Sequence, residues 1–153
     1  MCGGDPYHYK AVEPVMAAYA KQSRLLGPAG SGQLTKMVNQ ICIGGLVQGL
    51  SEAIHFAQKA DLDVAGVMDV ISKGAAQSWQ MENRWETMNK GEFDFGFAVD
   101  WMRKDLAICL AEAARNGADL PVTKIVDGYY AEVQEMGGNR WDTSSLIARL
   151  TKD

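Results

Sequence analysis

Apolar residues recur at helical spacing almost without interruption from residue 33 onward. The stretch from Gln33 to about Ala60 contains no proline, and as one helix it would measure about 42 Å at 1.5 Å per residue. Apolar positions fall on more than one face of this helix: Leu34, Met37, Val38, Ile41, Cys42, Leu46, Val47, Leu50 and Ile54. A long helix that is apolar on several sides has to be covered by others, so we expect it at the centre of a helical bundle.

The rest of the chain is divided into shorter helices by capping residues and glycines. The pattern predicts a helix at 64–71 after a cap at Asp63 and another at 78–89 before Lys90-Gly91. A longer helix is capped by Asp100 and runs to about Asn116, and a further one covers 121–136 before Gly137-Gly138. Thr143 or Ser144 caps a final short helix. Residues 92–99 form an aromatic and glycine-rich loop. The predicted fold class is therefore all-α, a bundle of about five or six helices around the long central one.

The first 27 residues follow a different pattern. Asp5 and Pro6 form an N-cap followed by proline at the first helical position, and Pro14 lies inside the helix that follows. Residues 23–26 are predicted as a short strand. One helix and one strand cannot form a sheet by themselves. We therefore expect residues 1–27 to be the end of a larger α/β unit and residues 28–153 to be an all-α domain.

Composition and charge narrow the class of protein. The chain of 153 residues has 47% apolar and 22% charged residues, which is typical of a soluble globular domain. Its net charge of −4 argues against a nucleic-acid partner or an anionic membrane surface. No apolar run approaches the roughly 20 residues that cross a bilayer, and the first residues lack the features of a signal peptide. We therefore expect a cytoplasmic protein with no nucleic-acid and no membrane partner.

Cysteine usage gives no sign of a disulfide framework or a metal site. The chain has three cysteines, Cys2, Cys42 and Cys109. The number is odd, the spacing is wide and there is no C-x-x-C pair. Cys42 and Cys109 lie among apolar neighbours, so we expect both to be small buried side chains.

The most informative residues for chemistry stand at the beginning of the long helix. The glycines of Gly27-Pro28-Ala29-Gly30-Ser31-Gly32 allow a tight loop, and the helix that follows directs free N–H groups and partial positive charge toward it, which suits a substrate carboxylate. Lys36 lies three residues before Asn39 and four before Gln40, so all three share one face. An amine there, with two amides beside it, suits general acid–base chemistry. The spacing alone matches neither a dinucleotide-binding fingerprint nor a phosphate-binding loop.

These residues resemble a known family. Gly27-x-x-Gly30-x-Gly32-x-x-x-Lys36-x-x-Asn39-Gln40 is similar to the signature that opens the C-terminal domain of the β-hydroxyacid dehydrogenases. A second segment, Gly96-Phe97-Ala98-Val99-Asp100-Trp101-Met102-Arg103-Lys104-Asp105-Leu106, resembles the family's Gly-Phe…Lys-Asp-Leu motif. The similarity covers essentially the whole chain. The family includes 3-hydroxyisobutyrate dehydrogenase and tartronate semialdehyde reductase, with 6-phosphogluconate dehydrogenase as a more distant relative.

The resemblance implies a role for each of these residues. In the family a hydride passes between a nicotinamide, of NAD or NADP, and the carbon that bears the substrate hydroxyl. Lys36 would take the hydroxyl proton on oxidation or return it on reduction. Asn39, Gln40 and Gly32 would bind the substrate, a short 3-hydroxy acid or its semialdehyde. Phe97 and Lys104 would contact the cofactor.

The family's dinucleotide-binding half, with its G-x-G-x-x-G fingerprint, has no counterpart here. Gly3-Gly4-Asp5 resembles a turn near the end of that half. The resemblance therefore implies a C-terminal piece that is inactive alone and does not bind its cofactor tightly.

The small residues Gly45 and Gly49, four apart on the long helix, predict that another helix packs closely there. The alternative hypothesis for the chain is a non-catalytic helical module whose glycine-rich long helix packs against a second copy. Both hypotheses predict a homodimer or a higher homo-oligomer. They differ at Lys36, because a dimer interface does not require a lysine beside two amides.

Overall fold

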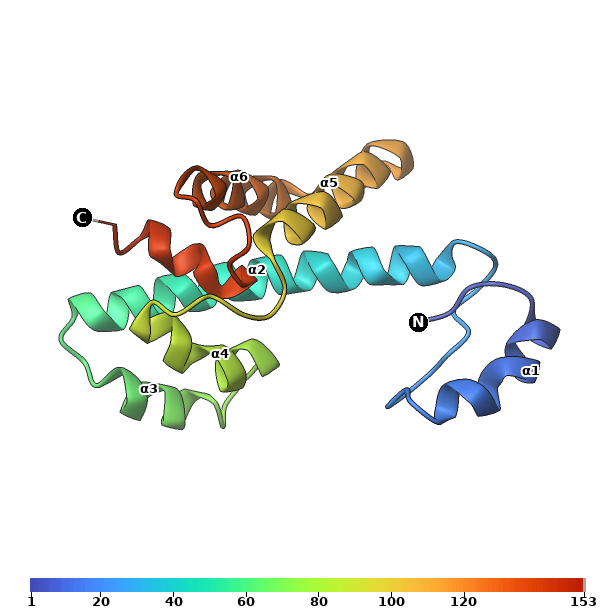
Figure 1. Ribbon diagram of the computed structural model, residues 1–153, viewed down its shortest axis with the longest axis horizontal. Helices are drawn as coiled ribbons and strands as arrows, with labels where there is room; N and C mark the ends of the chain where they lie inside the picture. The colour runs from blue at the N-terminus through green and yellow to red at the C-terminus, as the bar shows by residue number, and fades with distance from the viewer. Residues whose placement is uncertain (153) are drawn as a thin grey trace. The chain divides into compact units, whose positions relative to one another are not determined.

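The computed structural model describes residues 1–152, and most of them are helical (Figure 1). The elements are α1 (Pro6–Ala17), α2 (Ser31–Lys59), α3 (Val64–Ile71), α4 (Trp79–Lys90), α5 (Val99–Asn116), α6 (Pro121–Glu135) and the 3-10 helix η1 (Thr143–Arg149). The prediction of an all-α fold is confirmed. Of the helices in residues 1–152, none combines the length and the apolar character that spanning a bilayer requires.

The chain forms two compact units, residues 1–40 and the residues from 41 onward. The boundary between them falls inside α2, so this 29-residue helix contributes to both. The division between residues 27 and 28 that the sequence suggests stays a prediction.

In the first unit, α1 begins as the sequence predicts. The Asp5 carboxylate accepts hydrogen bonds from the backbone N–H groups of Tyr7 and His8, at 2.8 and 3.2 Å, and Pro6 occupies the first turn. The short predicted strand is reduced to one parallel bridge between Cys2 and Leu25. None of the α1 side chains is buried within the described residues.

In the second unit, local signals in the sequence account for where several of the shorter helices begin and end. Asp63 and Ser78 cap α3 and α4 through their side chains. Gly91 and Gly117, which follow α4 and α5, adopt the left-handed conformation that favours glycine.

Two predicted caps are wrong. Helix α5 begins at Val99 after Ala98, without a side-chain cap, and Asp100 lies inside its first turn. The N–H groups of Val99 and Asp100 instead donate to the carbonyl oxygens of Trp141 and Asn139, at 2.9 and 3.1 Å. A chain segment far along the sequence therefore satisfies this helix end, and Asp100 is not needed as a cap.

The last helix also has a different cap from the predicted Thr143 or Ser144. Asp142 precedes η1, and its carboxylate accepts a hydrogen bond from the Ser144 N–H at 3.1 Å. Thr143 is itself the first residue of the 3-10 helix, so the cap is the residue before it.

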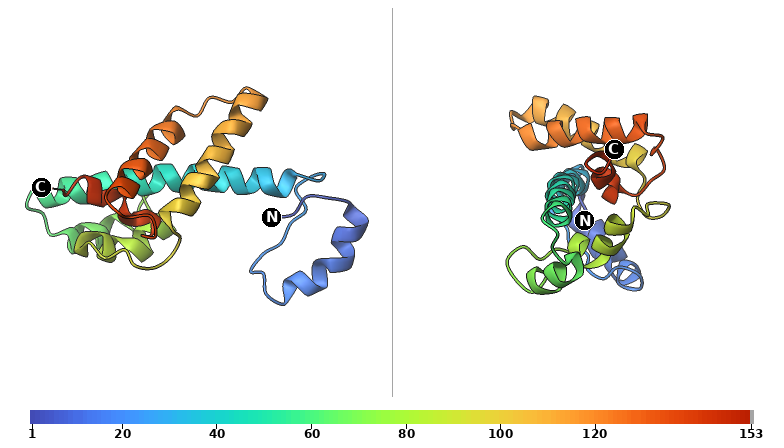
Figure 2. Two further views of the ribbon diagram at one scale, coloured as in Figure 1. Left: turned by 45° about the horizontal axis from the view of Figure 1, so that its top comes forward. Right: turned by 90° about the vertical axis from the view of Figure 1, so that its left-hand side faces the viewer.

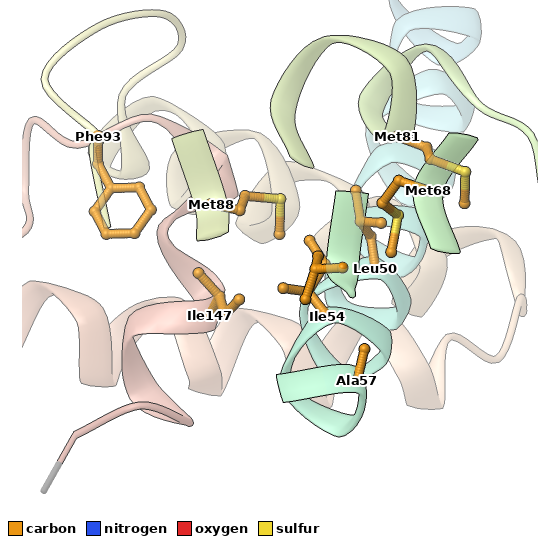
Figure 3. Close-up of a cluster of buried hydrophobic side chains, with 9 residues drawn as sticks. Leu50, Ile54, Ala57, Met68, Met81, Met88, Phe93 and Ile147 are labelled. Atoms are coloured by element: carbon orange, nitrogen blue, oxygen red, sulfur yellow. The ribbon is translucent and has the colours of Figure 1, made fainter. Parts of the chain in front are cut away.

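Two clusters of buried side chains form the core of the second unit. The first, drawn in Figure 3, consists of Leu50, Ile54, Ala57, Val64, Met68, Met81, Met88, Phe93 and Ile147. The second consists of Val47, Val99, Met102, Leu106, Val126, Tyr130, Val133 and Leu146. Helix α2 contributes residues to both clusters, and α5 and α6 pack side by side around the second (Figure 2).

The cysteines do not both behave as expected. Cys109 on α5 is buried, as predicted, and burial together with the nearby Asp105 charge raises the pKa of its thiol. Cys42 is exposed, so the prediction of a buried side chain is wrong for it. Apolar residues occur on several faces of α2, and the sequence does not tell which face its neighbours cover.

We expect a cavity-forming substitution in the first cluster to weaken the second unit. Ile54 is fully buried, so Ile54→Ala should lower the free energy of unfolding by about 2–5 kcal/mol. Urea titration followed by tryptophan fluorescence measures this, because all four tryptophans belong to the second unit. Phe56→Ala on the same helix is the matched control, since Phe56 is 71% exposed and its loss should cost less than about 0.5 kcal/mol. Equal losses for the two variants would contradict the described core.

We expect the buried phenol of Tyr130 to make the stability of the second unit depend on alkaline pH. Its phenol is fully buried and donates to the Thr143 carbonyl oxygen at 3.1 Å. Burial, with the Asp142 charge as a smaller cause, raises the pKa of Tyr130 far above its ordinary value. In the unfolded chain the phenol ionises near pH 10, so stability is retained below that pH and falls above it by about 1.4 kcal/mol per pH unit from this group.

Tyr130→Phe should therefore flatten the alkaline fall while costing about 1 kcal/mol at neutral pH through the lost hydrogen bond. Urea titrations between neutral pH and about pH 11 compare the two slopes. Tyr7→Phe is the control, because Tyr7 is 79% exposed and should leave the profile unchanged. An alkaline slope that Tyr130→Phe leaves as steep as before would show that this phenol ionises in the folded state.

Candidate functional site

The loop that leads into α2 is shaped by close backbone contacts. Gly30 has a φ of +98°, in the region that glycine alone enters readily. Gly3, from the beginning of the chain, lies so near this loop that a Cβ added to it would be 2.6 Å from the Pro28 carbonyl oxygen and 2.8 Å from the Gly32 nitrogen. Both positions therefore require glycine, one for its conformation and the other for space.

Hydrogen bonds hold the same loop at both sides. The Gly4 N–H donates to the Gly27 carbonyl oxygen at 2.9 Å, which ties the chain's first residues to the loop. At the start of α2, the Thr35 hydroxyl donates to the Ser31 carbonyl oxygen at 2.8 Å. The start of α2 is thus held by the Gly4 contact to the preceding loop and by the Thr35 contact inside the helix.

The four predicted substrate-binding or catalytic residues all lie in the first unit. Gly32 stands in the first turn of α2 and is half-buried. Lys36 and Asn39 are exposed one and two turns further on, whereas Gln40 is buried. The Asn39 side-chain nitrogen donates to the Gln40 side-chain oxygen at 2.8 Å, so the two amides orient each other.

The two predicted cofactor residues lie in the second unit. Phe97, just before α5, is half-buried, and its ring meets Trp101 edge to face with centroids 5.6 Å apart. The Lys104 side chain is 65% exposed, and its ammonium lies 2.9 Å from the Asp105 carboxylate. The structure therefore groups the site residues as two sets, one in each unit.

Nothing in the sequence singles out Asp142, which contacts the backbone of Phe97. An acidic residue in the stretch Gly137-Gly138-Asn139-Arg140-Trp141-Asp142 is typical of a surface turn. Asp142 is instead 1% exposed, and its carboxylate accepts from the Phe97 N–H at 2.9 Å. What distinguishes Asp142 from a surface turn residue is its hydrogen bonding to Phe97, 45 residues away, and to Arg84, 58 residues away.

The small residues of α2 have different surroundings. A Cβ on Gly44 would lie 3.6 Å from Val126 and 3.8 Å from Leu106, so this glycine faces α5 and α6. No atom of the described residues comes within 4 Å of a Cβ placed on Gly45 or Gly49, apart from α2's own backbone. These two glycines line an apolar hollow of about 290 Å³. The close helix packing predicted at them is therefore absent from residues 1–152.

Residues 1–152 bring no three histidine, cysteine, aspartate or glutamate side chains together in a way that could hold a metal ion.

Comparison with known proteins defines the class. A family model described as "NAD-binding of NADP-dependent 3-hydroxyisobutyrate dehydrogenase" matches residues 30–150, and the chain belongs to this family. The resemblance to β-hydroxyacid dehydrogenases is thereby confirmed at the level of the family.

Individual relatives agree with this assignment. The chain is 66% identical to an uncharacterized oxidoreductase of Shewanella frigidimarina, over 99% of this chain and 52% of that protein. It is 33% identical to the 2-hydroxy-3-oxopropionate reductase of Escherichia coli, over 98% of this chain and 51% of that enzyme. Among solved structures, the 3-hydroxyisobutyrate dehydrogenase of Mycobacterium tuberculosis superposes with a TM-score of 0.87 at 25% identity, over 97% of this chain and 53% of that one. The chain thus spans about half the length of the relatives it matches.

The Gly3 contact gives a local prediction. Gly3→Ala should push the first residues away from the loop before α2, because the added Cβ has no room beside Pro28 and Gly32. The Gly4 and Leu26 amides donate to the carbonyl oxygens of Gly27 and Cys2, both at 2.9 Å, so they report on this approach. Overpacking of this kind costs about 1–3 kcal/mol, so exchange of both amides should accelerate by roughly five- to hundredfold. Gly45→Ala, at a helical position with open space, is the control and should leave these amides unchanged. Unchanged exchange in Gly3→Ala would contradict the close approach.

Proposed function

We propose that this chain is the catalytic-lysine and oligomerisation domain of an NAD(P)-dependent dehydrogenase. Its substrate is a short 3-hydroxy acid similar to 3-hydroxyisobutyrate, or the matching semialdehyde in the reverse direction. Membership of the family supports the reaction class. The observation that carries the proposal is the position of Lys36, an exposed amine in the second turn of α2, followed one turn later by the linked amides of Asn39 and Gln40.

The proposed reaction moves one proton and one hydride. On oxidation, Lys36 Nζ accepts the proton of the substrate hydroxyl as the carbonyl double bond forms. The hydrogen on the same carbon leaves with its electron pair, and the nicotinamide ring supplies the acceptor for this hydride when it is bound. The exposed Asn39 holds a substrate oxygen, and the buried Gln40 supports substrate binding by accepting from the Asn39 amide. The N-terminus of α2 at Gly32 favours the carboxylate through its partial positive charge.

The proposed cofactor residues suit a dinucleotide. Phe97 offers a half-exposed aromatic face of the kind that packs on a planar ring. Lys104 offers an ammonium on a side chain that is 65% exposed, so it suits a phosphate group. The proposed cofactor is NAD or NADP, because neither Phe97 nor Lys104 distinguishes the two dinucleotides.

Because the relatives are about twice as long as this chain, we expect the chain alone to bind NAD or NADP only loosely and to be inactive. Mixing it with cofactor and 3-hydroxyisobutyrate should give no turnover.

A second candidate function is a non-catalytic module for homodimerisation. The apolar hollow at Gly45 and Gly49 favours it, as does the side chain of Leu46, which lines the hollow and is 47% exposed. Phe56, two turns after Gly49 on the same helix, is 71% exposed. A homodimer or higher homo-oligomer belongs to both proposals, because exposed apolar surface of this kind typically marks a protein interface.

Lys36→Ala tests the catalytic proposal in a protein that carries this chain together with a dinucleotide-binding domain. Loss of a general acid–base residue should reduce kcat by about 10²–10⁴-fold, while the Kd for the cofactor changes by less than about threefold. Stopped-flow absorbance of the reduced nicotinamide measures the first quantity and fluorescence titration the second. Lys124→Ala is the matched control, an exposed lysine on α6 whose loss should leave kcat unchanged. Full turnover in Lys36→Ala, with the oligomeric state unchanged, would favour the non-catalytic module.

A further inference from the structure

The carboxylate of Asp142 is surrounded by donors from three separate segments. It accepts from the Phe97 N–H at 2.9 Å, from the Ser144 N–H at 3.1 Å and from the Arg84 guanidinium at 3.2 Å. The side chain is only 2% exposed. A buried carboxylate requires such partners, and hydrogen bonds to a charged acceptor are about twice as strong as neutral ones.

The backbone beside Phe97 is built around this carboxylate. Gly96 has a φ of +71°, and a Cβ added to it would overlap the Asp142 Oδ2 atom. The Asp142 side chain therefore occupies the space that any residue other than glycine would use at position 96. One carboxylate oxygen thus determines both the identity of residue 96 and the direction of the Phe97 N–H.

Backbone pairing extends the contact in both directions. Asp142 forms an antiparallel bridge with Ala98, and its own N–H donates to the Phe93 carbonyl oxygen at 2.8 Å. The Thr143 N–H donates to the Phe97 carbonyl oxygen at 3.0 Å. Both backbone polar groups of Phe97 are therefore held by residues 142 and 143, and α5 starts two residues later.

Arg84 is the third partner, and it is itself held in place. Its guanidinium carbon lies 4.8 Å from the centre of the Trp79 ring and 5.1 Å from that of Phe95. Arg84 balances the charge of Asp142 at the Oδ1 atom, whereas the Phe97 N–H donates to the Oδ2 atom, so the two interactions of Asp142 can be separated by substitution.

We infer that Asp142 is a positioning residue for cofactor binding, through the Phe97 backbone and the first turns of α5 that carry Lys104. The inference rests on the proposed function of Phe97 and Lys104 and extends it to a residue that touches neither substrate nor cofactor. The carboxylate fixes where the Phe97 ring stands and where α5 begins. It has no part in proton transfer, so its loss affects binding of the dinucleotide and not the hydride step.

The test compares Asp142→Asn with Arg84→Gln, which removes the charge partner but leaves the carboxylate next to Phe97. In a protein that carries this chain with a dinucleotide-binding domain, Asp142→Asn should raise KM for the nicotinamide cofactor at least about tenfold, the factor expected from one lost charged hydrogen bond. It should change kcat less than about threefold. Arg84→Gln should change the cofactor KM less than about threefold. Equal KM changes in the two variants, or none in Asp142→Asn, would overturn the inference.

Two further measurements keep the outcome decisive. In the 153-residue chain, hydrogen exchange at the Phe97 amide should accelerate at least about tenfold in Asp142→Asn and much less in Arg84→Gln. This readout does not depend on catalysis, so it separates failure of the positioning role from failure of the proposed dehydrogenase activity. Should Asp142→Asn not fold, Gly96→Ala displaces the same backbone while keeping the carboxylate. It should reproduce the rise in cofactor KM, and an unchanged KM would overturn the inference.

Discussion

The buried carboxylate of Asp142 is the interaction on which the second unit depends most. A negative charge removed from water has to be matched by donors, and here they come from α4, from the backbone before α5 and from the start of η1. Because all three must meet at one side chain, the position of each limits the positions of the others. The aromatic loop that carries Phe97 therefore has a defined shape although it contains no regular secondary structure beyond one bridge.

A similar constraint acts at the beginning of α2 in the first unit, where it is steric instead of electrostatic. Gly3 and Gly32 let two backbone segments approach within the space that a single methyl group would need. The helix that carries Lys36, Asn39 and Gln40 is thereby anchored at its N-terminus. In both units, a candidate site residue follows a segment whose conformation is fixed by a contact from a distant part of the chain, which is how preorganised sites are usually supported.

Much of the fold follows from local signals. Asp5 and Asp63 were predicted as caps, and Gly91 and Gly117 as helix ends, because the groups that satisfy a helix terminus lie within a few residues of it. The predictions at Asp100 and at Thr143 or Ser144 were wrong for different reasons. Thr143 is already the first residue of η1, so the cap is Asp142, whereas the start of α5 is satisfied from outside the helix. Val99 and Asp100 obtain acceptors from Trp141 and Asn139, and this pairing cannot be inferred from either segment alone. Cys42 was misplaced because the covered face of α2 depends on neighbours distant in sequence.

The sequence by itself determined the helical class, most helix boundaries, the family and the candidate residues from Gly32 to Lys104, since periodicity, capping and motif spacing are all found along one chain. Only the tertiary structure decided that Asp142 is buried, that Gly96 makes room for its carboxylate, and that Gly44 packs against other helices while Gly45 and Gly49 do not. The physical reason is the same in each case. Burial and hydrogen bonding depend on residues that are remote in sequence, and no local pattern specifies which remote residues will meet.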